Sequence, residues 1–269
     1  YLIIKSGEKR SKNNELFNMK LTPSYRAKTV SSSDESKVYV SATSGANPSS
    51  YTISNVDKLA TAGVFKNGGS IVKDNQSFNV NESLYSQKDR LNNSTIEWNA
   101  GVILSKSIKT TEDSTVIKTN LENFKNMADW SIKVDGNSFK VVQTASELKD
   151  NAAAVLVDGS GNLTFKSNVK SGANIQITYI GESEKESDKY ITSSITTSTS
   201  LGEKYERFLI SSNDSLSAIQ SKVNSSNVGV TLFYDPFSKQ MTMTRKETGN
   251  YGSNIKADGE LLNDLFLFD

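Results

Sequence analysis

Residues 208–249 read FLISSNDSLSAIQSKVNSSNVGVTLFYDPFSKQMTMTRKETG, and the pattern of this stretch decides the fold class. A short apolar run opens it, and residues 212–215 then supply Ser, Asn and Asp side chains that can cap the first turn of a helix. Leu216, Ile219 and Val223 follow at helical spacing, so they lie on one face. The first half of the stretch therefore predicts a strand followed by an amphipathic helix.

The second half of the stretch predicts two strands joined by a turn. Residues 224–227 end the helix, because their short polar side chains compete for backbone hydrogen bonds. A strand follows, since apolar and aromatic residues alternate at Val230, Leu232 and Tyr234. Asp235-Pro236 favours a turn, because proline fixes its own φ at the second turn position. The returning strand carries Met241 and Met243 in alternation with threonines.

This order of elements resembles a repeat found in bacterial flagellar hook and cap proteins. The resemblance rests on Ser215-Leu216 opening the helix, Val223-Asn224 near its end, and residues 229–231 leading the strand. A second stretch, residues 31–60, is similar to the start of the head region in the flagellar hook-associated protein 2 family. The resemblance therefore implies a filament cap protein.

Residues 31–60 carry this second resemblance as two strands separated by turns. A Ser- and Asp-rich turn comes first, and Asn47-Pro48 forms a turn between the strands. The first expected strand contains Val38, Val40 and Ala42. The second contains Tyr51, Ile53 and Val56, and Leu59-Ala60 end it.

The composition argues against most kinds of catalysis. The 269 residues contain no cysteine and no histidine, which excludes disulfides, thiolate nucleophiles and the commonest general base near neutral pH. Glycoside cleavage by two carboxylates remains possible. We expect a protein that is not an enzyme, with no catalytic residue, no cofactor and no metal site, and we assign no residues to an oligomer interface.

Charge and hydropathy point to no nucleic acid and no membrane. Lys and Arg number 31 against 30 Asp and Glu, and the two signs are interspersed along the chain. No apolar run approaches the roughly 18 to 20 residues needed to span a bilayer. Residues 1–4 are too short for the core of a signal peptide, so we expect the chain to begin inside a longer protein.

Length and turn frequency indicate a mainly β or α+β chain of two small domains, one inserted in the other, and the resemblance implies that they are head domains. We expect a partial helical leg segment over residues 1–34, with an apolar face at residues 16–21 that ends before Pro23. A discontinuous β-rich head domain is expected over residues 35–125 and 200–269, and it carries the motif described above. A second β-rich head domain is expected over residues 126–199.

Further local patterns predict the remaining elements. Trp130, Ile132 and Val134 should pair with residues 139–142 through an Asp-Gly-Asn turn. A short helix should follow within residues 144–153, and then strands at residues 155–157 and 163–165. This order repeats that of residues 208–243 and suggests a weak internal repeat.

Other strands are expected where apolar residues alternate between turn signals. They lie at residues 37–42, 51–56, 70–72, 95–98 and 115–117. Asn67-Gly68-Gly69 should form a hairpin turn, and residues 191–200 should form an extended strand with Ile191 and Ile195 facing inward. The apolar cluster at residues 261–268 should form a short helix or strand that needs burial.

Three patterns imitate functional sites. Asp158-x-Ser160-x-Asn162 imitates a calcium loop, but Leu163 and Val169 stand where such a loop has glycine and glutamate. Trp98 and Trp130 could stack on sugars, although strand aromatics more often fill a sheet face. Residues 182–186 contain three glutamates, and their lysine-dotted context favours a solvated loop.

The resemblance implies a structural cap at the distal end of the bacterial flagellar filament, secreted and extracellular. Copies would form a ring-shaped homo-oligomer that promotes flagellin polymerisation and prevents loss of unpolymerised flagellin. Its partners would be flagellin, hook-filament junction proteins and an export chaperone, with a coiled coil in the full-length protein. The alternative is a bacterial surface adhesin or glycan-binding β module, and behind it a carboxylate-dependent glycosidase.

Overall fold

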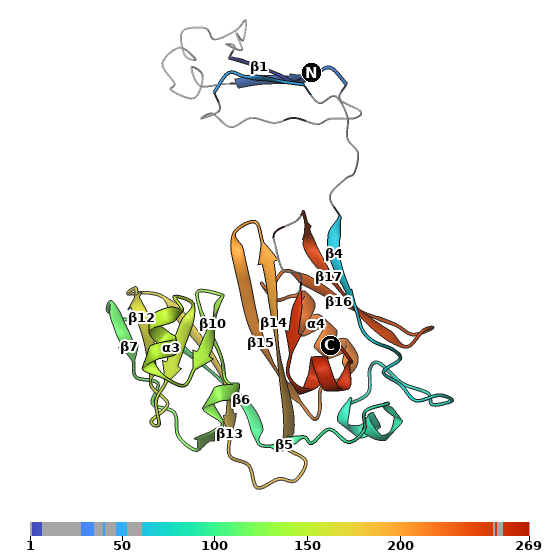
Figure 1. The fold of residues 1–269 in the computed structure, drawn as a ribbon. Helices are drawn as coiled ribbons and strands as arrows, with labels where there is room; N and C mark the ends of the chain where they lie inside the picture. The colour runs from blue at the N-terminus through green and yellow to red at the C-terminus, as the bar shows by residue number, and fades with distance from the viewer. Residues whose placement is uncertain are drawn as a thin grey trace, which may run out of the picture. The chain divides into compact units, whose positions relative to one another are not determined.

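The computed structural model describes residues 2–6, 28–34, 40, 47–52, 61–249, 251 and 255–268. The chain divides into two compact units, Tyr1–Leu59 and Ala60–Asp269, which are described separately (Figure 1). Strands dominate the described residues, so the mainly β, α+β class expected from the sequence is confirmed.

The described part of the first unit is a three-stranded antiparallel sheet with the order β2-β1-β3. Its strands are β1 (Leu2–Ser6), β2 (Lys28–Ser32) and β3 (Ser50–Tyr51). β-Branched residues such as Thr29 and Val30 favour extended backbone. The helical leg expected over residues 1–34 is therefore wrong for residues 2–6 and 28–32, which are strands.

Several expected features of the first unit lie outside the described residues. They are the apolar helix face at residues 16–21 with Pro23, the strand positions Val38, Ala42, Ile53 and Val56, and Leu59-Ala60. Within the described residues, Asn47 and Pro48 have no regular secondary structure, and β3 coincides with the start of the second expected strand.

The larger sheet of the second unit is built from residues 102–181, named here the inserted unit. Its order is β6-β13-β9-β10-β11-β12-β7, and β8 also pairs with β13. Only β10 and β11 run parallel, and α3 (Ala145–Asp150) connects them. A short 3₁₀ helix, η2 (Met127–Asp129), precedes β9. The strands are β6 (Val102–Lys109), β7 (Ser114–Ile117), β8 (Phe124–Lys125), β9 (Ser131–Val134), β10 (Asn137–Val142), β11 (Ala154–Val157), β12 (Leu163–Val169) and β13 (Asn174–Gly181).

The core of the inserted unit forms around Trp130, which is fully buried. Its ring contacts Phe124 and Tyr179 at centroid distances of 5.2 and 5.5 Å. The expected hairpin of β9 and β10 is confirmed. Asp135 and Gly136 have φ values of 49° and 80°, as a two-residue turn matched to the strand twist requires.

The rest of the second unit, residues 61–100 and 189–268, is named here the motif unit. It contains a sheet of order β15-β14-β18, in which β5 also pairs with β14, and a three-stranded sheet of order β16-β17-β4. Its strands are β4 (Ala62–Lys66), β5 (Asn99–Ala100), β14 (Lys189–Thr199), β15 (Gly202–Ser211), β16 (Val230–Asp235), β17 (Gln240–Thr248) and β18 (Lys256–Asp258). Its helices are the 3₁₀ helix η1 (Tyr85–Arg90), α4 (Leu216–Asn224) and the π-helix η3 (Glu260–Leu265).

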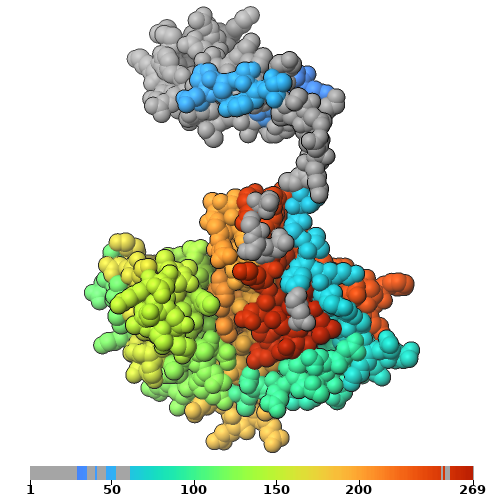
Figure 2. Space-filling view, viewed as in Figure 1, coloured from blue at the N-terminus to red at the C-terminus, as the bar shows by residue number. Residues whose placement is uncertain are grey.

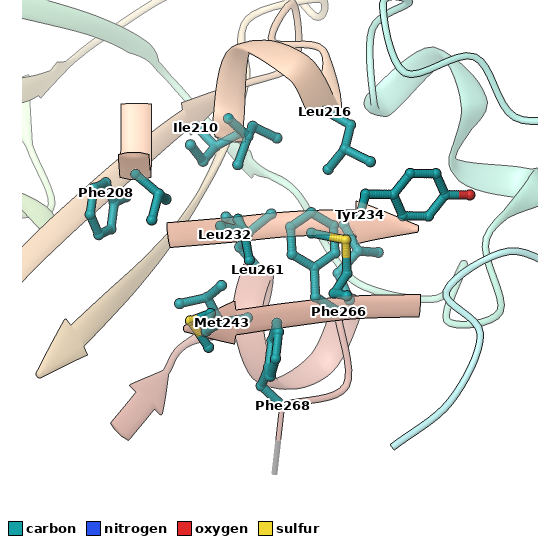
Figure 3. Packing of buried hydrophobic residues seen from close by; sticks show 14 of the residues in the cluster. Phe208, Ile210, Leu216, Leu232, Tyr234, Met243, Leu261, Phe266 and Phe268 are labelled. Atoms are coloured by element: carbon teal, nitrogen blue, oxygen red, sulfur yellow. The ribbon is translucent and has the colours of Figure 1, made fainter. Parts of the chain in front are cut away.

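The motif expected at residues 208–249 is confirmed element by element. Ser215 caps α4 by accepting a hydrogen bond from the Ala218 backbone N–H at 3.2 Å. Leu216, Ile219 and Val223 are all fully buried on the inner face of the helix. Figure 3 shows this core, where side chains from β15, α4, β16 and β17 meet the apolar C-terminal cluster around Phe266 and Phe268.

Two asparagine side chains pair with backbone groups where a further strand would otherwise bind. Asn224, at the end of α4, accepts from the Leu232 N–H at 2.6 Å and donates to the Leu232 carbonyl at 3.1 Å. Asn67 accepts from the Met241 N–H at 3.1 Å and donates to the Phe266 carbonyl at 2.8 Å. The hairpin turn expected at Asn67-Gly68-Gly69 is therefore wrong: Asn67 joins β17 to the C-terminal cluster instead.

The sheet pairing also moves the expected domain boundaries. β6 and β7 lie in the eight-stranded sheet with residues 124–181, whereas residues 35–125 were expected in the other domain. β14 pairs along its length with β15 and not with the inserted unit, although residues 126–199 were expected there. The reason is that β6 pairs with β13, a contact between distant segments that no local pattern reveals.

Smaller expectations have mixed outcomes. The strand at residues 115–117, the helix after Thr144 and the strands after it are confirmed. The strand expected at residues 95–98 is wrong because regular pairing begins only at Asn99, and residues 70–72 contribute a single bridge from Val72 to Leu91. Ile191 and Ile195 are fully buried in β14, as expected, and the C-terminal apolar cluster is buried as η3 and the residues after it.

Candidate functional site

The apparent calcium loop is a hydrogen-bonded turn. Asp158 Oδ1 accepts from the backbone N–H groups of Ser160 and Asn162, both at 2.9 Å, and its Oδ2 accepts from the Asn162 amide at 3.1 Å. These bonds, led by the one from the Asn162 N–H, lower the pKa of the Asp158 carboxyl. Among the described residues no group of three or more acidic side chains could hold a metal ion.

The residues of the other two patterns that imitate sites either pack in the core or lie in an exposed connection. Trp130 is fully buried, and Trp98 packs edge-on against Tyr85 at a centroid distance of 5.1 Å while half-buried on the main core. Glu182, Glu184 and Glu186 are all exposed in the connection between β13 and β14. In the part of the chain that the structure describes, no helix is long and apolar enough to cross a membrane.

The inserted unit and the motif unit are joined along β15 by polar contacts. Lys133 on β9 forms an ion pair with Glu206 on β15, whose side chain is 5% exposed. Asp129 accepts hydrogen bonds from Arg207 at 3.5 Å and from the Tyr190 hydroxyl at 3.0 Å. Burial raises the pKa of Tyr190 to about 12, so this hydroxyl remains a donor at physiological pH.

Apolar contacts and two glycines complete this junction. Ile180 and Tyr190 are fully buried against each other with Leu209, and Ile103 packs beside them. A Cβ on Gly101 would lie 2.6 Å from the Ile180 side chain, and one on Gly181 would lie 2.6 Å from Leu104. Figure 2 shows the yellow-green inserted unit directly beside the orange β14 and β15. The junction therefore holds the two parts of the second unit in one arrangement.

Few apolar side chains of the second unit are strongly exposed, and two lie at hairpin tips. Leu201 is 88% exposed between β14 and β15, and Phe237 is 97% exposed between β16 and β17. Val64 and Phe233 are 65% and 57% exposed on the outer face of the three-stranded sheet. Side chains of this kind, exposed without a partner in the chain, are candidates for contact with another molecule.

The inserted unit has two depressions. One of about 210 Å³ is polar, and its lining includes Ser105, Ser107, Ser131, Gln176 and Thr178. Neighbouring strands place these residues side by side, since Gln176 lies opposite both Ser107 and Lys133, and Thr178 opposite both Ser105 and Ser131. The other depression, of about 250 Å³, has an apolar floor that includes Phe139 and Phe165.

The sequence did not predict any of these surface features. It assigns no residues to an oligomer interface, and at Phe237 it predicts only a turn. One signal was present, because an aromatic residue inside the turn Asp235-Pro236-Phe237-Ser238 has no strand position that could bury it.

A scan against protein families finds a match that covers most of the first unit and ends just inside the second. Residues 7–63 match the family model described as Flagellar hook-associated protein 2 N-terminus. This match supports membership of the flagellar hook-associated protein 2 family. The match overlaps residues 31–60, on which the resemblance to this family depended. No curated protein and no solved structure matches the chain.

The match supports a flagellar cap-protein role in general and agrees with a location on the flagellum outside the cell. The family is a structural flagellar family whose members interact with filament components.

Proposed function

We propose that this chain is the structural cap at the distal end of the flagellar filament, where it promotes flagellin polymerisation and retains unpolymerised flagellin. The observation that carries this proposal is the family match at residues 7–63. The motif confirmed at residues 208–249 supports it independently, since that order of elements also resembles flagellar hook and cap proteins. No bond chemistry is needed, because the role is to position subunits.

In this proposal copies assemble as a ring whose partners are flagellin, hook-filament junction proteins and, before export, a chaperone. A closed ring requires that one face of each copy bind a different face of its neighbour. The packed junction along β15, with its ion pair to the buried Glu206 and its apolar cluster, supports such a role, since a plate that guides incoming subunits must keep its shape.

Deletion of the gene tests this function. The deletion strain should form no normal filaments and should release flagellin monomers into the medium, and the full-length gene should restore both properties. Electron microscopy of the full-length protein should show rings of defined copy number. Filaments of normal length in the deletion strain would end the cap proposal.

A second candidate, a glycan-binding module, is favoured by one feature. In the polar depression Ser105, Ser107, Ser131, Gln176 and Thr178 make no side-chain hydrogen bond to any other described residue, so their hydroxyl and amide groups are free to bind a neutral polyol. The Gln176→Ala variant should then lose binding on a glycan array. An array without signal for the full-length protein would exclude this candidate.

A further inference from the structure

The apolar depression of the inserted unit is shaped for an uncharged side chain. Phe165 and Val169 are nearly buried in its floor, and the ring of Phe139 meets that of Phe165 edge-on at a centroid distance of 5.2 Å. Val134 and Ala152 line the sides. Phe139, Val134 and Ala152 therefore supply its accessible apolar surface. The volume of the depression, about 250 Å³, exceeds the ~150 Å³ of an apolar cavity that holds a benzene molecule.

The charged groups at the rim are already paired within the chain. Lys170 forms an ion pair with Asp113 at 2.7 Å, and Lys166 donates to the Lys149 carbonyl at 2.5 Å. Asp135 accepts from the Asn174 N–H at 2.8 Å. Because these charges have partners, the depression suits an apolar ligand better than an ion.

Phe237 is a side chain of matching chemistry that the chain itself leaves uncovered. Its backbone is fixed by Asp235, which accepts from the Phe237 N–H at 3.0 Å and from the Ser238 hydroxyl at 2.6 Å. Proline at position 236 restricts the turn further. The ring is 97% exposed on a turn that is already ordered, so binding it costs little conformational entropy.

The depression and Phe237 lie on different sides of the second unit. In Figure 1 the β16–β17 hairpin points away from β10 and β12, which contribute residues to the depression. Phe237 therefore cannot reach the depression of its own chain. A contact between them joins two copies, and it is heterologous, as a ring requires.

We propose that Phe237 of one copy occupies the depression formed by Val134, Phe139, Ala152 and Phe165 of the next copy. This inference rests on the proposed function, because the cap requires a heterologous contact between copies. Phe237 is favoured over Leu201 because its ring can make an edge-to-face contact with Phe139, which is partly exposed. It is favoured over Phe233, which lies on a sheet face and is only 57% exposed.

Cysteine cross-linking of the full-length protein tests the contact directly. This chain contains no cysteine, so Phe237→Cys and Ala152→Cys introduce its only thiols. Under mild oxidation a mixture of the two single variants should form covalent dimers containing one copy of each. The matched control pairs Leu201→Cys with Ala152→Cys and should give no such dimer. Equal yields from the two mixtures, or none from the first, would overturn the contact.

Assembly of alanine variants provides the second measurement. Phe237→Ala should raise the protein concentration needed for half-assembly by about tenfold or more, as truncation of a central aromatic anchor does. Leu201→Ala, which removes an equally exposed side chain from another tip, should leave it unchanged. Ala152→Trp should act like Phe237→Ala, because the indole fills the depression.

The unmodified protein separates this contact from the function on which it rests. If the unmodified protein forms rings and Phe237→Ala does too at the same concentration, the contact is wrong and the cap function stands. If the unmodified protein forms no ring, both the contact and the ring fail. If Phe237→Ala loses both rings and complementation of the deletion strain while Leu201→Ala keeps both, the contact is supported.

Discussion

Residues 137–169 and residues 202–248 contain the same order of elements, a strand, a helix and two more strands, yet they fold differently. In the first region β10 and β11 are parallel neighbours in one sheet. In the second region β15 pairs with β14, whereas β16 pairs with β17 in another sheet. The two regions are therefore not copies of one unit, although their patterns suggested a repeat.

The helices explain this difference. α3 buries only Leu148, which packs with Val142 and Ala154 in a small cluster apart from the main core. A helix with one buried side chain serves here only as the connection between the parallel strands β10 and β11. α4 buries three side chains along its length and belongs to the largest core cluster. Its apolar stripe occupies the space between two sheets and so separates β15 from β16.

The largest effect should come from truncating the same residue type in the two helices. Leu216→Ala in α4 should lower the free energy of unfolding by about 3 to 5 kcal/mol, because Leu216 is fully buried in the large cluster. Leu148→Ala in α3 should lower the free energy of unfolding by no more than about 2 kcal/mol, the lower limit for a buried leucine, because its small cluster can collapse. Equilibrium denaturation by urea measures both. Equal losses would show that α3 contributes as much to stability as α4.

The next effect should come from the ion pair that joins the inserted unit to the motif unit. Lys133→Met leaves the buried Glu206 carboxylate without its partner and should cost about 2 kcal/mol, less than for a fully buried pair because Lys133 is 27% exposed. The double variant Lys133→Met/Glu206→Leu should recover most of this loss, since no charge then remains buried. A double-mutant cycle by urea denaturation measures the coupling. Additive losses would mean that the pair is not coupled.

The sequence predicts the second region well because its signals are local. The cap at Ser215, the helical spacing up to Val223 and the alternation in β16 all lie within a few residues of the structure they specify. The same holds for the β9–β10 hairpin, whose turn residues fix its register.

What the sequence does not predict depends on distant contacts. Apolar and polar residues alternate in only part of β6 (VILSKSIK). The strand belongs to the inserted unit because it pairs with β13. β14 buries small polar residues such as Ser193 and Thr197 on a strand that is covered along most of its length. The apolar depression is likewise assembled from four separate segments, so no single stretch of sequence carries its signal.

A smaller effect should come from the two helix caps. Ser215→Ala and Thr144→Ala each remove an oxygen that accepts a backbone N–H at the first turn, so each should cost about 1 kcal/mol. The cost for Ser215 should appear in global unfolding, because α4 is part of the main core. The cost for Thr144 should appear as faster hydrogen exchange confined to α3. Global destabilisation by Thr144→Ala would mean that α3 unfolds only together with the sheet.

The smallest effect should be a pH dependence that the Glu147 side chain gives to α3. Glu147 accepts hydrogen bonds from the Thr144 hydroxyl at 2.9 Å and from the Thr144 N–H at 3.0 Å, and no acidic residue lies in the first turn of α4. These bonds, led by the one from the hydroxyl, lower the pKa of the Glu147 carboxyl below its ordinary value of 4.5. A lowered folded-state pKa means that the stabilisation is complete above pH 4.5 and is lost as the pH falls through the folded-state value. Hydrogen exchange in α3 should therefore accelerate selectively in that acid range, after correction for intrinsic rates, and Glu147→Gln should abolish the change. If Glu147→Gln left the acid response of α3 unchanged, Glu147 would not be its source.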